Sequence, residues 1–204
     1  MTDPELPAGV ERRTVAGEER LTTEGEPVYG EPTVDGRRVW DAGRSKLGAM
    51  LELGMDTRLE GSESVLYLGA ASGTTVSHVA DFAGPTYAVE FAPRPVRQLV
   101  EVAESRPRLF PLLADARNPR EYAGVVEADL DCIVQDVATR NAQFLTDDGL
   151  LLAAVKARSE DVVADPDEVF EAVTSSLTQE YEILETRRLL PYHEDHLGVV
   201  ARKR

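Results

Sequence analysis

The stretch VLYLGAASGTT, residues 65–75, joins an apolar run to a turn of small residues. A helical pattern follows over Thr75–Phe82, where apolar residues recur at intervals of three and four. An apolar strand, a glycine turn and a helix in this order predict the first strand–helix unit of a parallel sheet. Backbone N–H groups in such a turn can closely approach a polar or anionic ligand, but tight loops of this kind also occur without any ligand.

Apolar runs alternate with amphipathic stretches along the rest of the chain, which predicts an α/β protein with a seven-stranded, doubly wound sheet. The expected strands are Ser64–Leu68, Pro85–Val89, Leu109–Leu113, Leu130–Val134, Leu150–Val155, Glu182–Thr186 and Leu197–Ala201. The expected helices are Thr75–Phe82, Pro93–Ser105 and Asp165–Leu177. These units indicate a sheet built from parallel strands with crossover helices.

The first forty residues differ from the rest, because they are rich in Gly, Pro, Glu and Thr. Short strands are expected around Gly9–Val15, Pro27–Tyr29 and Arg37–Trp40, separated by turn signals. A helix is expected after Arg44, where apolar residues recur at helical spacing up to Gly54. We therefore divide the chain into a small β-rich N-terminal module, residues 1–40, and a larger domain, residues 41–204.

The charge is strongly acidic, with 37 Asp and Glu against 22 Lys and Arg and a net charge of −15. Only three of the basic residues are lysines: Lys46, Lys156 and Lys203. A carboxylate-rich, lysine-poor surface suits high salt, because the Debye length falls to about 3 Å at 1 M and screens self-repulsion. We therefore predict halophilic adaptation. At ordinary salt the same charge would argue against a nucleic-acid partner. Because the charge is interpreted here as an adaptation to high salt, that exclusion is provisional.

Cys132 lies inside an apolar run, so a buried strand residue is favoured over a catalytic thiol. The N-terminus has no basic region followed by an apolar stretch, and no apolar run reaches the ~18 residues of a membrane helix. We expect a soluble, cytoplasmic protein that has no membrane partner.

Carboxylates follow three of the predicted strands: Glu90, Asp115 and Asp136. Ligands of open α/β sheets bind at the carboxyl ends of strands, so these side chains should meet beside the glycine turn. A nucleoside ligand would account for carboxylates at these positions. Glu90 can accept hydrogen bonds from both ribose hydroxyls, Asp115 can accept one from an adenine amine, and Phe91 can flank the ring.

The spacing of Gly69 and Gly73 does not match the G-x-G-x-x-G pattern that binds a dinucleotide pyrophosphate. A nucleoside ligand without phosphates is therefore preferred. S-adenosylmethionine is the obvious candidate, because its positive sulfonium and amino groups are compatible with the surrounding carboxylates.

Seven segments of the chain resemble the motifs of fibrillarin in its archaeal form. They are Trp40-Asp41 with Arg44–Leu47, Val65–Thr75, Ala88–Phe91 (AVEF), Ala114–Arg117 (ADAR), Gln135–Ala138 (QDVA), Val155–Ser159 (VKARS) and Pro191–His196 (PYHEDH). The resemblance runs in family order from about residue 10 to the C-terminus and implies a Rossmann-like methyltransferase sheet. It also implies S-adenosylmethionine as cofactor, bound by Gly69, Ala70, Ser72, Thr74, Thr75, Glu90, Phe91, Asp115, Ala116, Asp136, Val137, Ala138 and Thr139.

The resemblance further implies an RNA ribose 2′-O-methyltransferase of box C/D guide ribonucleoproteins, acting on pre-rRNA and on tRNA. The implied partners are the box C/D guide RNA, the target rRNA or tRNA, a Nop-type scaffold protein and a kink-turn-binding ribosomal-type protein. Whether the chain also forms a homodimer is left open. His193 and His196 lie in a polar loop, but two histidines seldom complete a metal site, so no metal is expected.

The resemblance assigns catalytic roles to Lys46, Asp136, Lys156 and His196. A ribose 2′-OH is a very weak acid, so an adjacent ammonium must favour the developing alkoxide. We expect Lys156 to do so, Asp136 to orient Lys156 and the hydroxyl, and Lys46 to add positive charge. Arginine replaces such a compact point charge poorly, which explains why lysine is kept at two of these positions.

One departure from the family pattern lies after Asp136, where residues 139–145 lead almost at once to the turn Asp147–Gly149. This crossover is near the ~10–12 residues that a parallel connection needs. It puts the cofactor contact at Thr139 in doubt. Two alternatives therefore stay open: a non-catalytic assembly factor of the guide ribonucleoprotein, and an S-adenosylmethionine methyltransferase with another substrate.

Overall fold

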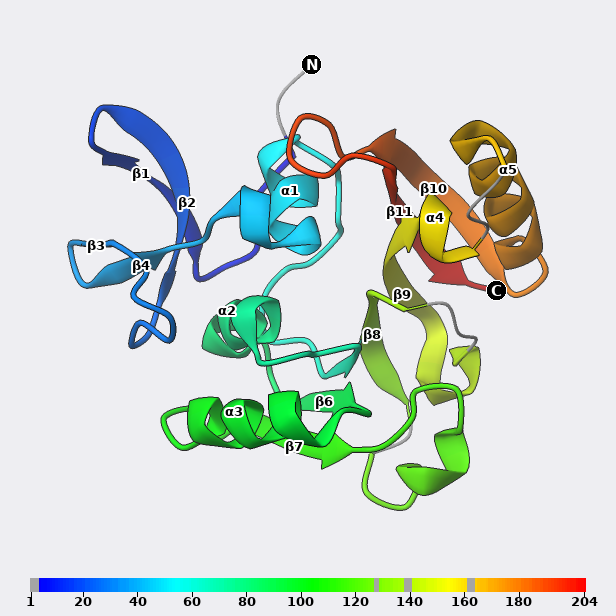
Figure 1. The fold of residues 1–204 in the computed structure, drawn as a ribbon, viewed down its shortest axis with the longest axis horizontal. Helices are drawn as coiled ribbons and strands as arrows, with labels where there is room; N and C mark the ends of the chain where they lie inside the picture. The colour runs from blue at the N-terminus through cyan, green and yellow to red at the C-terminus, as the bar shows by residue number, and fades with distance from the viewer. Residues whose placement is uncertain (1–3, 127–128, 138–140, 161–163) are drawn as a thin grey trace.

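The computed structural model describes residues 4–126, 129–137, 141–160 and 164–204, and it contains two sheets (Figure 1). The larger sheet has seven strands in the order β10-β11-β9-β8-β5-β6-β7. Their bounds are β5 Val65–Leu68, β6 Thr86–Glu90, β7 Leu109–Leu113, β8 Leu130–Gln135, β9 Leu145–Lys156, β10 Tyr181–Arg188 and β11 His196–Lys203. Strand β5 pairs in parallel with both β6 and β8, so the chain winds outward in both directions from it. This is the doubly wound sheet that the sequence predicts.

The expectation of a parallel sheet is wrong for β11, which is antiparallel to both β9 and β10. Only residues 189–195 separate β10 from β11. Because a parallel connection needs ~10–12 residues or more, this short connection can only join two antiparallel strands. Strand β11 therefore inserts between its two neighbours in the opposite direction.

Helices cover both faces of the larger sheet and make a three-layered arrangement (Figure 1). One face carries α1 (Lys46–Glu52), α2 (Thr74–Phe82) and α3 (Pro93–Ala103), and the other carries α4 (Ala157–Glu160) and α5 (Pro166–Leu177). Short 3-10 turns are η1 (Ala42–Arg44), η2 (Pro119–Glu121) and η3 (Ala142–Phe144). Each face has its own buried core, and β5 contributes alternate residues to the two cores.

The N-terminal sheet contains β1 (Val10–Val15), β2 (Glu18–Glu24), β3 (Thr33–Val34) and β4 (Arg37–Val39), in the order β1-β2-β4-β3. Leu21 and Trp40 pack into the same core as α1 and α2, so this sheet is joined to the rest by burial.

The strand predicted around Pro27–Tyr29 is wrong. The N–H groups of Val28 and Tyr29 donate instead to the Glu31 carboxylate, at 2.7 and 2.9 Å, and hold a loop. Strand β2 is not predicted from the sequence, because EERLTTE is almost wholly polar.

Strand β9 begins at Leu145 rather than at Leu150, where the sequence predicts it. Leu130 pairs with Leu145, and Cys132 pairs with Leu150, so the predicted turn at Asp147–Gly149 forms an irregularity inside β9. The crossover from β8 to β9 is short, as predicted, and its described part includes η3.

The prediction that Cys132 is a buried strand residue is confirmed, because it is fully buried in β8. Its neighbour Asp131 accepts hydrogen bonds from the backbone N–H and hydroxyl of Ser64, at 2.8 and 2.7 Å. In the described part of the chain, no helix is long and apolar enough to cross a membrane.

A buried ion cluster joins the N-terminal sheet to α2 and to the end of α3. The Asp81 carboxylate of α2 accepts from Arg38 of β4 at 2.8 Å and from Arg106 at 3.0 Å. It also accepts from the Thr23 hydroxyl at 2.7 Å. The Asp81 and Arg38 side chains are 3% and 0% exposed, so the cluster is shielded from solvent and its members depend on one another.

The charge of the chain predicts that salt stabilises the fold. Most of the carboxylates are exposed, and at net charge −15 they repel one another unless salt screens them. The melting temperature should therefore rise when KCl is raised from about 0.2 M to about 2 M, a range over which the Debye length falls severalfold. Circular dichroism during heating measures it. A melting temperature that falls over this range would contradict halophilic adaptation.

Candidate active site

A cavity of about 1250 Å³ lies at the carboxyl ends of the parallel strands, where ligands of doubly wound sheets bind. The residues that end or follow β5, β6, β7, β8 and β9 all contribute to its wall. Ten residues singled out from the sequence line it: Lys46, Gly69, Glu90, Phe91, Asp115, Ala116, Asp136, Val137, Lys156 and His196. The structure thus brings the four predicted catalytic residues and much of the predicted cofactor set to one place.

Other predicted cofactor residues lie close by without lining the cavity. Ala70 and Ser72 belong to the turn after β5, and Thr74 and Thr75 begin α2. The Thr75 side chain is hydrogen-bonded to buried Tyr67. Ala138 and Thr139 lie outside the described residues, so these two predictions receive no structural account.

Glu90 is the most buried carboxylate in the cavity wall, with 7% of the residue exposed. One of its oxygens accepts from the N–H of Ala71 at 3.0 Å, and the other accepts from the N–H of Ala92 at 2.9 Å. An ionised carboxylate has about four acceptor positions. Each oxygen therefore keeps capacity for one more donor, which is what two neighbouring ribose hydroxyls require.

The glycine turn needs its glycines for conformation and space. Gly69 has φ +86° and Gly73 has φ +100°, a region that side chains disfavour. A Cβ on Gly69 would lie 2.7 Å from a methyl carbon of Val137, so the turn packs directly against the segment that follows β8. The turn and Asp136 are thereby held at one edge of the cavity.

Asp115 is more exposed than Glu90 and already has a strong partner. The Arg117 side chain donates to both of its oxygens, at 3.0 Å from Nε and 2.7 Å from Nη2. These hydrogen bonds and that from the Arg117 N–H lower the pKa of Asp115 to about 2. An adenine amine at this carboxylate would therefore share it with Arg117, a contact that the sequence does not predict.

Lys46 and Asp136 form an ion pair inside the cavity. The Lys46 Nζ lies 2.7 Å from Asp136 Oδ2, and the two side chains are 31% and 23% exposed. Lys46 is the first residue of α1, and its Ser45 N-cap accepts from the N–H of Gly48 at 3.0 Å. The role predicted for Asp136 is to orient Lys156, whereas the structure pairs this carboxylate with Lys46.

Lys156 and His196 stand opposite each other on β9 and β11. Lys156 makes no ion pair with a described residue and is exposed to the cavity. His196 Nδ1 lies 2.5 Å from the carbonyl oxygen of Glu194, so Nδ1 carries the hydrogen and Nε2 of the neutral ring is left as an acceptor. Burial, the charge of Lys46 and that of His193 together hold the pKa of His196 below its usual value.

Tyr29 contacts the glycine turn, a role that the sequence does not predict, because a tyrosine in a polar loop carries no signal for it. Its hydroxyl donates to the backbone carbonyl of Ser72 in the glycine turn. The N-terminal module therefore braces the turn from one side while Glu90 holds it from the other.

Comparison with known proteins identifies the family. The fibrillarin family model matches residues 10–204, nearly the whole chain. The chain belongs to the fibrillarin family. A fibrillarin-like rRNA/tRNA 2′-O-methyltransferase from Halorubrum lacusprofundi is 69% identical over 209 residues, which cover 98% of this chain and 99% of that relative.

Two solved fibrillarin structures share the fold over almost the full length. One, determined in a fibrillarin/Nop5p complex, is 39% identical, with a TM-score of 0.88 over 98% of this chain and 100% of that chain. The other is fibrillarin from Aeropyrum pernix with natively bound S-adenosyl-L-methionine. It is 38% identical, with a TM-score of 0.82 over 95% of this chain and 94% of that one. The cavity described above thus lies in a fibrillarin fold.

Proposed function

We propose that this chain is an S-adenosylmethionine-dependent RNA ribose 2′-O-methyltransferase that acts within a box C/D guide ribonucleoprotein. The observation that carries the proposal is the cavity itself. In a chain of the fibrillarin family, one cavity combines a buried carboxylate suited to a nucleoside with two lysines, an aspartate and a histidine. The first group suits cofactor binding, and the second suits activation of a hydroxyl.

The residues present fit the cofactor. Glu90 is buried and has two acceptor positions left for the ribose hydroxyls, and Phe91, 69% exposed, is free to cover an adenine ring. We assign Gly69, Glu90, Phe91, Asp115, Ala116, Asp136 and Val137 to cofactor binding. Ala70, Ser72, Thr74 and Thr75 shape the turn beside them. S-adenosylmethionine, when bound, supplies a methyl group activated by a positively charged sulfur.

The four catalytic residues act on the ribose hydroxyl. Lys156 has no carboxylate partner among the described residues, so its ammonium is available to stabilise the alkoxide that develops at the 2′-oxygen. Lys46 and Asp136 hold each other, so that Asp136 orients the hydroxyl and Lys46 fixes that carboxylate. His196 offers its Nε2 lone pair to the hydroxyl proton.

The depressed pKa of His196 predicts the pH dependence of methyl transfer. A lowered pKa keeps the ring neutral down to a pH below the usual value of about 6.5, and only the neutral ring can accept a proton. Single-turnover rates measured across pH should therefore be level near neutrality and fall at an acid-side midpoint below about 6.5. His196→Ala should lower the pH-independent rate near neutrality and abolish the decrease in rate at acid pH. A midpoint above the usual value, or an unchanged profile in His196→Ala, would contradict the role.

RNA selection comes from base pairing with the guide RNA, so the chain needs no base-reading module. We propose a Nop-type scaffold protein and a kink-turn-binding ribosomal-type protein as partners, and the cytoplasm as location. The fibrillarin/Nop5p complex of a relative supports the scaffold. Residues 41–204 would form the methyltransferase domain and residues 1–40 the N-terminal module, a division that stays a prediction.

A reconstituted guide complex tests the proposal. With methyl-labelled cofactor at high salt, label should enter target RNA that pairs with the guide, and it should not enter RNA whose pairing region is scrambled. Equal labelling of the paired and the scrambled RNA would favour a methyltransferase with another substrate. A complex that assembles but transfers no label would favour the assembly factor, the reading that the short crossover containing Ala142–Phe144 supports.

Glu90→Gln tests the cofactor site separately. The change removes the charge and one acceptor oxygen while preserving the shape of the side chain. The loss of a hydrogen bond to a charged group, about 1.5–3 kcal/mol, should weaken cofactor binding by about 10- to 100-fold. Isothermal titration calorimetry measures it, with Glu101→Gln on the exposed side of α3 as the matched control. Equal affinities in both variants would contradict the assignment.

A further inference from the structure

The loop between β10 and β11, residues 189–195, contacts both segments that carry the cavity lysines. Lys46 begins α1, one residue after η1, and Lys156 ends β9, directly before α4. These segments are distant in the sequence and belong to different parts of the fold. A loop that binds both can therefore set their relative position.

The first contact is made by His193. Its Nε2 lies 2.8 Å from the carbonyl oxygen of Ala42, and because a carbonyl has no hydrogen, the histidine must donate. Ala42 opens η1, and the N–H of Ser45 points back to the same carbonyl at 3.4 Å before α1 begins. The hydrogen bond from His193 therefore anchors the turn that places Lys46.

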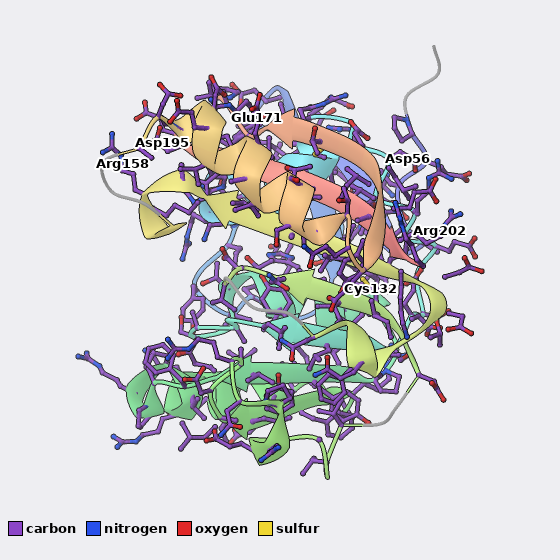
Figure 2. All side chains as sticks on the ribbon, turned by 90° about the vertical axis from the view of Figure 1, so that its right-hand side faces the viewer. Asp56, Cys132, Arg158, Glu171, Asp195 and Arg202 are labelled. Atoms are coloured by element: carbon purple, nitrogen blue, oxygen red, sulfur yellow. The ribbon has the colours of Figure 1, made fainter. Side chains whose placement is uncertain are left out.

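The second contact is made by Asp195. Its carbonyl accepts from the N–H of Ala157 at 3.0 Å, and its carboxylate accepts from Arg158 Nε at 2.8 Å. Figure 2 shows Arg158 and Asp195 together at one edge of the molecule. Both contacts lie directly after Lys156. The residue that follows the loop, His196, begins β11 and pairs with Lys156 across the sheet.

The loop also makes hydrogen bonds within itself. The N–H groups of Tyr192 and His193 both donate to the carbonyl of Leu189, at 3.0 and 2.9 Å. The rings of His193 and His196 lie 5.6 Å apart, yet His193 does not line the cavity. His193 is thus close to the reacting groups without being one of them.

We propose that His193 is a positioning residue, which together with Asp195 clamps Lys46 at a fixed place relative to Lys156 and His196. The role in catalysis rests on the proposed function. Methyl transfer needs the hydroxyl, the ammonium and the carboxylate in alignment, and a shift of about 1 Å can cost about 100-fold in rate. Because Nε2–H donates the bond, a side chain with an amide N–H at similar reach should replace it.

Three variants test the clamp: His193→Ala, His193→Gln and, as the matched control, Glu194→Ala. Glu194 is an exposed neighbour whose carbonyl, not its side chain, bonds His196. Hydrogen exchange of the backbone amides of residues 42–52 in the whole protein, without cofactor, reports the anchoring of η1 and α1. Single-turnover rate and cofactor affinity are measured in the guide complex.

We expect His193→Ala to speed exchange in residues 42–52 and to lower the rate by about 10- to 100-fold, with cofactor affinity unchanged. His193→Gln should restore both, and Glu194→Ala should behave as the wild type. Exchange in His193→Ala as slow as in Glu194→Ala would overturn the clamp. A loss of melting temperature and cofactor affinity that His193→Gln does not rescue would overturn it too. If the wild type transfers no methyl group, the proposed function fails. Hydrogen exchange in residues 42–52 would still show whether His193 anchors η1 and α1.

Discussion

Lys156→Ala should lower the single-turnover rate of methyl transfer by about 100- to 1000-fold, the usual cost of removing one group that stabilises a developing oxyanion. Lys156 lines the cavity, pairs in register with His196 and makes no ion pair with a described residue. Its charge is therefore available for the ribose 2′-oxygen. Rates at saturating cofactor, with the guide complex in molar salt, measure the effect.

The same change at another lysine provides the control. Lys203 lies at the end of β11 and donates to the carbonyl of Leu145 at 2.6 Å, outside the cavity, so Lys203→Ala should keep the wild-type rate. Lys156→Arg should restore only part of the activity, because the planar guanidinium is a poor substitute for a compact ammonium. Equal rates in Lys156→Ala and Lys203→Ala would remove Lys156 from the mechanism.

Asp81→Ala should destabilise the fold by about 3–5 kcal/mol, the cost of leaving a buried charge without its partner. Arg38 and Arg106 both rely on this carboxylate, and their side chains are 0% and 6% exposed. The change would loosen the N-terminal sheet from α2. Urea unfolding at constant high salt, fitted with a common slope, measures the loss.

Asp56→Ala is the matched control for the buried cluster. Asp56 also pairs with an arginine, Arg58, but the two side chains are 48% and 50% exposed, and Asp56 lies at the molecular surface (Figure 2). Exposed pairs contribute about 0–1 kcal/mol. If both variants lose the same small amount, the Asp81 cluster is not what joins the two sheets.

The larger sheet could be predicted because its signals are local. The apolar run and glycine turn of residues 65–75 form β5, the turn and α2 as expected, and the carboxylates Glu90, Asp115 and Asp136 meet because strand ends share one edge. The direction of β11 was not foreseen, because an apolar run does not indicate which way a strand runs.

The features that the sequence does not predict have a different cause: they depend on tertiary contacts between polar residues. Strand β2 exists because β1 and β4 flank it, although its sequence is polar. The pairing of Lys46 with Asp136 joins segments that no periodicity links. The same holds for Tyr29 and Ser72 and for His193 and Ala42, where a side chain meets a backbone carbonyl and the acceptor has no sequence signature.

The most direct test of the account is transfer of labelled methyl to a guide-paired RNA and to the same RNA with a 2′-deoxyribose at the target nucleotide. Both targets pair with the guide alike, and they differ only in the hydroxyl on which the four catalytic residues are proposed to act. The account predicts label in the ribose target and none at the deoxyribose nucleotide. Equal labelling of the two targets would place the methyl group elsewhere and contradict ribose 2′-O-methylation.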